Sequence, residues 1–552
     1  MFDVEEDLRR QARMESERSN FEALWHEIGQ LILPRQADFL GSTSFSQGAR
    51  RTEHIYDETA MMALDHGCAV FEGEVIPAGA QWQIIMGLDP ELMKNQRARL
   101  WFELKTSQLF QLRNSAYSGF GNQTHESVAS LLAFGLQGMA PALIRDGRGV
   151  PVGIGYRSEH IGQLYIQENY RGEIDIVHRK FTLTNRQALQ QWDDKAPECA
   201  RKGERDGRLD DANGYIHVLR PNPAFDPARI DAAGKQIASY YIAVADRQAF
   251  DQGGYRSMPT IVSRYEKSPT ETYGRSPAIN VLPSIKATQA MMRDLVTAIE
   301  FMAGPALLAH SDMQDEMLFY APRSVSYGGL DDRGNPTVRR MFEDPDISAA
   351  MKLLEDTRGV IKRAFFEDLY TVRQDLKSHI TAFEMMDRAQ QRGLLLAPLQ
   401  RQETEWLTPM AHRELDLMNE IGLLDDMPPE VAEAGGLYQT IYENPLARAR
   451  KAEGAAGFYN MLNGLSALMQ LDPVNTVPEF FRRYPFGKVV AGLGQLHAVP
   501  VAWEASEDEQ KAAAAEARAL ADKAKLIEVG TAAAGIAKDI AAAAAAGGAH
   551  AA

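Results

Sequence analysis

The sequence predicts a mixed α+β protein that is mainly helical. Long stretches repeat apolar residues at steps of three and four, which is typical of amphipathic helices. Between residues 142 and 181 the apolar period changes to two, with turn residues at Asp146-Gly147 and Arg171-Gly172, which predicts two hairpins of one antiparallel sheet. A chain of 552 residues is too long for one core, so we expect several packed units.

The composition excludes several classes of protein. The hydrophobic fraction of 45% and the charged fraction of 24% are those of a globular protein. No apolar run reaches the roughly 18 to 20 residues that cross a bilayer, and the charged N-terminus lacks the apolar stretch of a secretory signal, so we expect no membrane association. The net charge of −16 argues against tight binding of nucleic acid, which depends on clustered Lys and Arg. It is compatible with a protein that lets DNA slide past without binding it tightly.

The N-terminal half alternates predicted helices with predicted strands. Residues 3–33 form an amphipathic pattern that Pro34 stops, and its apolar side is expected to comprise Leu8, Phe21, Leu24, Trp25, Ile28, Leu31 and Ile32. A second apolar stripe ends before Pro77 and includes Cys68, so we expect Cys68 in the core and the neighbouring His66 outside it. The remaining predicted elements are a strand at 81–86, helices at 90–113 and 121–136, and strands at 215–219, 240–245 and 260–265.

The C-terminal half has a different order of elements. Pro283 is expected to open a helix over 283–303, which Gly304 and Pro305 end. An insertion with short strand-like pieces follows, and then a second helix whose apolar face is Ile347, Met351, Leu354, Ile361, Phe365 and Leu369. The pattern continues with a short polar loop, a long helix kinked at Pro398 and Pro409, short helices to about residue 500, and an alanine-rich helix that begins at Ser506.

No stretch matches a catalytic or metal-binding template. A phosphate-binding loop needs Gly-Lys followed by Ser or Thr, whereas Gly234-Lys235 precedes Gln and Gly487-Lys488 precedes Val. The nucleophile elbow G-x-S-x-G and the zinc motif His-Glu-x-x-His are absent, and two cysteines cannot form a four-cysteine metal site. We therefore expect a structural protein without a cofactor, although a two-metal nuclease built from scattered carboxylates stays open.

Four stretches together resemble a known family. They are ETYGRSPAINVLPSIK at 271–286, TAFEMMDR at 381–388, EWLTPMAHR at 405–413 and YENPLARARKAE at 442–453, and in this order they resemble the portal proteins of short-tailed phages, also called head-to-tail connectors. The resemblance extends from the N-terminal helix to about residue 510. It implies a ring, usually of twelve subunits, at one capsid vertex of a virion whose proteins are made in the cytoplasm of the host bacterium.

The resemblance also implies names for the regions. A wing would comprise 1–282, and the long helix 381–423 would return to it. The stem would consist of helices 283–303 and 346–369, joined by a clip at 304–345. A channel loop would occupy 370–380 and a crown 424–505, with 506–552 either extending the crown as a barrel or forming a low-complexity tail.

The expected partners follow from the same resemblance. Double-stranded DNA would pass through the channel, a terminase ATPase and later tail adaptors would dock on the clip, and major capsid and scaffolding proteins would surround the ring. We expect Arg373, Lys377 and His379 to face the channel, and we expect partner contacts in the clip at Arg323, Tyr327, Arg333, Arg339 and Arg340. The alternatives are a minor capsid or scaffolding protein without a DNA channel, and a packaging-associated nuclease.

Overall fold

The computed structural model describes residues 3–37, 51–304, 306–309, 330, 333–341, 347–367, 397–436 and 438–443, with isolated residues between 461 and 519. Contacts divide the chain into two compact units. Unit 1 is Met1–Ile84, Thr106–Asp426 and Thr440–Leu462, and unit 2 is Ile85–Lys105, Met427–Gln439 and Asn463–Ala552. The largest sheet and the two longest helices belong to unit 1.

The first helix, α1 (Val4–Leu31), is capped by the side chain of Asp3 and ends before Pro34, which confirms the predicted helix. Its buried face differs from the predicted apolar stripe. Towards the N-terminus that face is polar, with Asp7, Gln11 and Arg18, and towards the C-terminus it is apolar, with Trp25 and Ile28.

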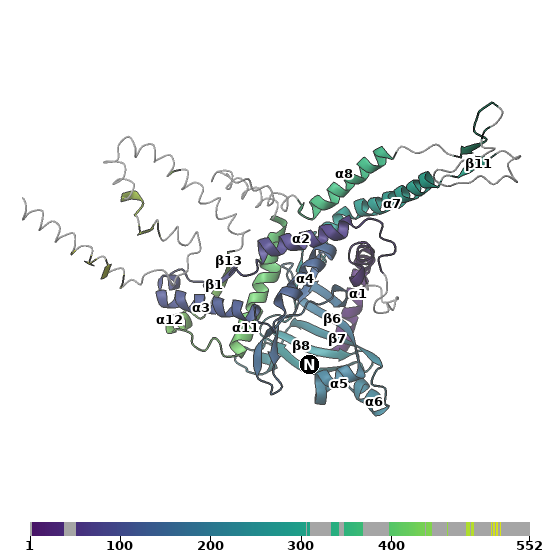
Figure 1. The fold of residues 1–552 in the computed structure, drawn as a ribbon. Helices are drawn as coiled ribbons and strands as arrows, with labels where there is room; N and C mark the ends of the chain where they lie inside the picture. Colours follow the sequence, from purple (N-terminus) through teal and green to yellow (C-terminus); the bar gives the residue numbers. More distant parts are fainter. Residues whose placement is uncertain are drawn as a thin grey trace, which may run out of the picture. The chain divides into compact units, whose positions relative to one another are not determined.

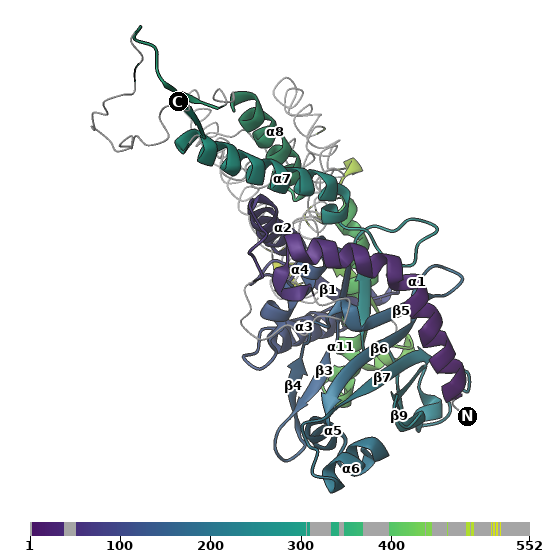
Figure 2. The same ribbon diagram turned by 90° about the vertical axis from the view of Figure 1, so that its right-hand side faces the viewer.

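A five-stranded antiparallel sheet lies beneath α1 (Figure 2). Its strands are neighbours in chain order: β5 (Leu164–Glu168), β6 (Ile174–Thr184), β7 (Ala212–Pro221), β8 (Ile237–Ala243) and β9 (Gln248–Tyr255). Val4 and Leu8 of α1 pack on one face, against Ile216 and its neighbours. Because side chains alternate along a strand, Tyr215 points to the opposite face.

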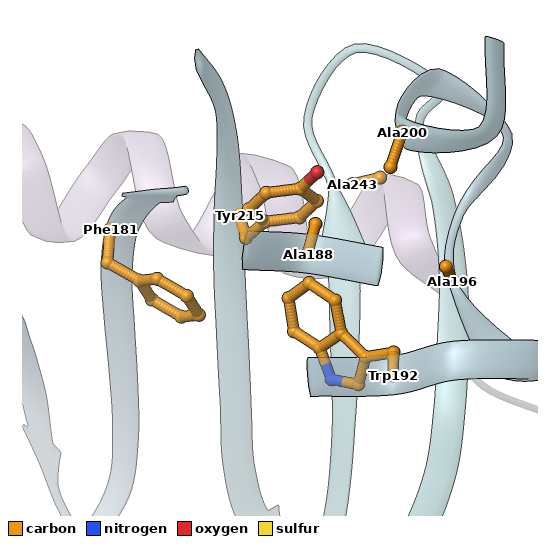
Figure 3. Close-up of a cluster of buried hydrophobic side chains, with 7 residues drawn as sticks. All are labelled: Phe181, Ala188, Trp192, Ala196, Ala200, Tyr215 and Ala243. Carbon is orange, nitrogen blue, oxygen red and sulfur yellow. The ribbon is translucent and has the colours of Figure 1, made fainter. Parts of the chain in front are cut away.

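That opposite face is covered by α5 (Asn185–Trp192) and α6 (Glu198–Arg205), which the sequence reasoning did not predict. Figure 3 shows Trp192 and Tyr215 in the cluster between these helices and the sheet. The ring of Trp192 meets Phe250 edge-on at 4.9 Å and Tyr215 at 5.0 Å between ring centroids. The sheet is therefore the middle layer of three.

The two predicted hairpins exist, but the prediction of one common sheet is wrong. β3 (Ala142–Arg145) and β4 (Pro151–Gly155) form a separate two-stranded sheet, and β2 (Leu136–Met139) pairs with β10 (Ile261–Arg264). After β4 the chain turns towards β2, where the amide of Glu159 donates to the carbonyl of Gly138 at 2.8 Å. This detour and the turn η3 (Ile161–Gln163) separate β4 from β5.

The helices around these sheets follow the predicted patterns closely. α2 (Thr59–Val75) buries Cys68 and leaves His66 exposed, as predicted. The ring of Phe71 stacks on Trp406 at 6.0 Å between centroids. The other elements are η1 (Pro34–Gln36), β1 (Gln83–Gly87), η2 (Leu92–Lys94), α3 (Gln96–Arg113), α4 (Phe120–Phe134), η4 (Asp193–Lys195), η5 (Ala232–Gly234), η7 (Ala397–Gln400), the π-helical turn η8 (Glu403–Leu407), α11 (Thr408–Glu420), α12 (Pro429–Glu433) and β13 (Tyr438–Tyr442).

The helix predicted at 283–303 begins earlier than expected. α7 spans Pro277–Ala303, so the prediction that Pro283 opens it is wrong. The hydroxyl of Ser276 accepts from the amide of Ile279 at 3.0 Å, and Pro277 occupies the first turn, where a missing N–H costs nothing. Pro283 lies inside the helix, which tolerates the loss of one backbone hydrogen bond there.

The helix predicted at 346–369 is shorter in the structure. α8 spans Ser348–Ala364. Phe366 adopts a left-handed backbone with φ of 66°, and a right-handed helix cannot continue through this conformation. Figures 1 and 2 show α7 and α8 side by side, extending away from the sheets of unit 1. In the insertion between them, β11 (Leu307–Ala309) pairs with β12 (Val338–Arg340).

Candidate functional site: the α7–α8 projection and its anchor

The most prominent feature of unit 1 is the pair formed by α7 and α8. At 1.5 Å per residue, α7 is about 40 Å long and α8 about 26 Å. The first half of α7 packs on α1 and α4, and Gln289 is its last buried residue. Beyond Gln289, α7 relies on α8 for contact, so we call these two helices the α7–α8 projection.

The projection exposes apolar side chains along both of its helices. Six large ones are between 39% and 59% exposed: Val296, Ile299 and Phe301 on α7, and Met351, Leu353 and Val360 on α8. Exposed apolar area costs about 25 cal/mol per Å² relative to burial, so a partner that covered these side chains would lower the free energy of the projection. The face that the sequence predicted for the second helix is only partly right, since Leu354, Ile361 and Phe365 are buried but Met351 is not.

A loop before α2 anchors both helices of the projection. The side-chain oxygen of Gln289 on α7 accepts from the amides of Tyr56 and Asp57 at 2.7 and 3.0 Å, and its nitrogen donates to the Asp57 carbonyl at 2.6 Å. From α8, the guanidinium of Arg358 donates to the Asp57 carboxylate at 2.8 Å. Asp57 therefore joins α7, α8 and the start of α2, and we call this group the Asp57 anchor.

The charge of the Asp57 anchor is stabilised in place. Burial raises the pKa of the Asp57 carboxyl, but hydrogen bonds from Thr59 and from Arg358, together with the Arg358 charge, outweigh burial and leave the pKa below its ordinary value. The carboxylate is 1% exposed, and the Arg358 side chain is 28% exposed. Asp57 is consequently ionised at neutral pH.

A second centre holds η8 against the strands. Arg264 is 1% exposed, and its guanidinium donates to Glu405 at 2.9 and 3.1 Å and also to Glu168. Lys267 contacts Glu168 at 2.6 Å, and Arg401 contacts Glu405 at 2.9 Å. Three cations and two carboxylates thus fix the segment 401–405 that leads into α11.

The stretch 271–286 joins α7 to the body of unit 1 by a close backbone crossing. A Cβ on Gly274 would lie 2.3 Å from the Gly135 carbonyl, and a Cβ on Gly135, where φ is 81°, would lie 2.6 Å from the Gly274 carbonyl. Beside the crossing, the Ser276 hydroxyl donates to the Ala133 carbonyl at 2.7 Å. The glycines and the serine of this stretch therefore serve packing and capping.

The predicted site residues are only partly described. Arg373, Lys377 and His379 lie outside the described residues, and so do Arg323 and Tyr327. Arg333, Arg339 and Arg340 are exposed, and in the β11–β12 ladder Arg339 lies opposite Leu308 and Arg340 opposite Leu307. The regions 370–380 and most of 304–345 and 444–552 are likewise outside the described residues.

Sequence reasoning missed the polar residues that build the anchors. Asp57 and Gln289 are 232 positions apart, and the sequence around neither residue predicts their contact. One signal was present, because Glu405 opens the stretch 405–413 on which the family resemblance rested. In the described part of the chain, no three His, Cys, Asp or Glu side chains gather as metal ligands do, and no helix is apolar over a membrane-spanning length.

Comparison with known families decides the identity of this architecture. The family model described as "Bacteriophage head to tail connecting protein" matches residues 5–477. The chain belongs to this family. The matched residues include the projection, the Asp57 anchor, the centre around Arg264 and the β11–β12 region. The predicted resemblance to portal proteins of short-tailed phages is confirmed.

Two curated relatives carry matching names. The portal protein of Salmonella phage epsilon15 is 25% identical over 475 residues, which cover 84% of this connector and 83% of the relative. The probable portal protein of Bordetella phage BPP-1 is 24% identical over 475 residues, with the same coverage. Both relatives are named as portal proteins, and the chain is similar to each of them over most of its length.

A solved structure described as "Neck of empty GTA particle computed with C6 symmetry" is also similar. It shows 12% sequence identity and a TM-score of 0.33, and the match covers 73% of this connector and 92% of that chain.

Proposed function

We propose that the connector assembles into a closed dodecameric ring at one capsid vertex, with α7 and α8 of each copy forming a stem around a channel for double-stranded DNA. The observation that carries the proposal is the exposed apolar surface of the α7–α8 projection. Because the chain belongs to the head-to-tail connecting family, we infer that a further copy of the chain covers this surface. Cyclic association buries it in every copy at once.

The charge of the chain supports a conduit. With a net charge of −16 the protein has few spare cations for phosphates, and each phosphate contact would add salt-dependent affinity that slows passage. We propose that the loop 370–380 approaches the DNA through Arg373, Lys377 and His379. These contacts are independent of base sequence, since they address the backbone.

The insertion 304–345 is proposed as the clip on which partners dock. Arg333, Arg339 and Arg340 are exposed there, and Arg323 and Tyr327 belong to the same insertion. A terminase ATPase binds this region during packaging, and tail adaptors replace it afterwards. Residues 1–282 and 381–423 form the wing that faces major capsid and scaffolding proteins, 424–505 form the crown, and the protein is made in the host cytoplasm.

Electron microscopy of the purified full chain tests the proposal. We expect ring-shaped particles with an axial hole in negative stain, with a mass by native mass spectrometry of twelve chains. Only monomers or open filaments would contradict the ring and favour a minor capsid or scaffolding role. Hydrolysis of ATP or DNA by the pure protein would favour an enzyme of the packaging machinery.

A further inference from the structure

A groove runs between α2 and α8 at the base of the projection. It has a volume of about 280 Å³, and its floor is formed by Ala63 and Phe365, which are 5% and 1% exposed. Met62 lies at its edge with 60% of its surface exposed. The polar residues along the rim include His66, Glu355, Arg358, Lys362 and Glu367. The groove is thus an apolar depression with a rim of both charge signs.

Helix geometry assigns the exposed residues of α8 to two opposite flanks. Met351 shares a face with the groove residues Glu355, Arg358 and Lys362, because their spacing is four, three and four residues. Leu353 follows Met351 by two residues, which places it about 160° around the helix axis. Val360 follows Leu353 by seven residues and lies on the same side as Leu353. We call Leu353 and Val360 the α8 stripe.

We propose that the α8 stripe of one copy docks into the α2–α8 groove of the next copy. The proposal rests on the ring proposed above and names the surfaces that close it. The two surfaces differ, lie on opposite sides of one helix and are both exposed, which is the arrangement that a head-to-tail cyclic contact requires. Arg363 is exposed close to the stripe and Glu355 is exposed on the groove rim, so opposite charges are present on the two sides for pairing across the contact, whereas Arg358 and Lys362 are already paired with Asp57 and Glu367.

Disulfide trapping tests the proposed contact directly. The variant carries Met62→Cys and Leu353→Cys with Cys199→Ser, while Cys68 stays because it is 1% exposed and burial raises its pKa. Mild oxidation should give a ladder of covalent multimers, whereas each single-cysteine variant should stay monomeric in denaturing gels. If electron microscopy shows rings but no ladder forms, the contact is wrong and the ring stands. If the wild-type chain forms no ring, the proposed function fails first.

Charge substitution gives an independent measurement. Met62→Asp and Val360→Asp place a carboxylate in the contact, and each should raise the protein concentration for half-maximal assembly by about tenfold or more. The matched control is Ile230→Asp, since Ile230 is 96% exposed on a loop far along the chain from both surfaces. Thermal unfolding of the three variants should match the wild type. The proposed contact would be contradicted if Met62→Asp and Val360→Asp assembled like the wild type, or if Ile230→Asp impaired assembly equally.

Discussion

At the scale of single residues, Asp57 has a larger structural role than its sequence neighbourhood suggests. Its backbone is hydrogen-bonded to Gln289 of α7, and its carboxylate is paired with Arg358 of α8. A buried carboxylate with this many donors holds both helices at one position. The orientation of the α7–α8 projection on unit 1 therefore depends on one loop.

Removal of the Asp57 carboxylate should be costly. We expect Asp57→Ala to lower the free energy of unfolding by about 2 to 3 kcal/mol, because it removes the buried acceptor of Arg358 and leaves the amide of Thr59 without its acceptor. Asp294→Ala is the control, since its pair with Arg293 is exposed and should change stability by at most about 1 kcal/mol. Urea denaturation measures both, and equal effects would contradict the anchor.

The glycine crossing gives a second prediction at this scale. Gly135→Ala should destabilise the protein by more than Gly207→Ala, although both positions have positive φ. The backbone strain, about 1 to 2 kcal/mol, is common to the two substitutions. Only at Gly135 would the new methyl also collide with the Gly274 backbone, since nothing lies within 4 Å at Gly207. Thermal melts of the pair isolate the collision, and a larger loss for Gly207→Ala would contradict it.

At the scale of elements, α1 shows what periodicity can and cannot predict. The helix and its end at Pro34 followed from spacing and proline chemistry, but the buried face was wrong at Asp7, Gln11 and Arg18. Arg18 is buried because its guanidinium donates to three carbonyls of 161–164, at 2.7 to 3.2 Å. These carbonyls belong to the turn η3 and the start of β5, which are distant in sequence, so no pattern within α1 contains them.

Some strands were predictable from the sequence and others were not. Alternating segments such as 164–168 and 237–243 were predictable from period two. β9 was missed because Gln248–Tyr255 contains two glycines and little apolar alternation, and it is a strand through its pairing with β8. For the candidate site, the order of a helix, an insertion and a second helix was predicted. The Asp57 anchor and the centre around Arg264 depend on tertiary contacts and were not predicted.

The sheet beneath α1 predicts an acid dependence of stability. Burial, together with nearby arginines, lowers the pKa of both His178 and His217 to about 3. Unfolded histidine titrates near 6.5, so between these values the unfolded chain binds protons that the folded chain does not, and stability falls as pH falls. We expect a loss of up to about 1.4 kcal/mol per pH unit for each histidine below about pH 6.

Urea denaturation at pH 7.5 and 5.5 measures this slope. His178→Gln and His217→Gln should each flatten it relative to the wild type. The buried Asp7 carboxyl acts in the opposite direction, since burial raises its pKa and its protonation favours the folded state as pH falls. Slopes that the histidine substitutions leave unchanged would contradict the assignment.

At the scale of the whole molecule, the exposed apolar residues of the projection connect the single chain to an assembly. Exposure of Phe301 and Leu353 to water carries a free-energy cost, and the proposed ring would remove it by burial against a neighbouring copy. Family membership and the exposed side chains of the projection together support the proposed assembly.

The most direct measurement is a cryo-electron microscopy reconstruction of the assembled full-length chain. We expect a closed ring in which α7 and α8 of neighbouring copies lie side by side around an axial channel, with Leu353 and Val360 covered by the next copy. A ring whose α7–α8 projections point outward without touching their neighbours would contradict it, and so would an assembly without a continuous channel.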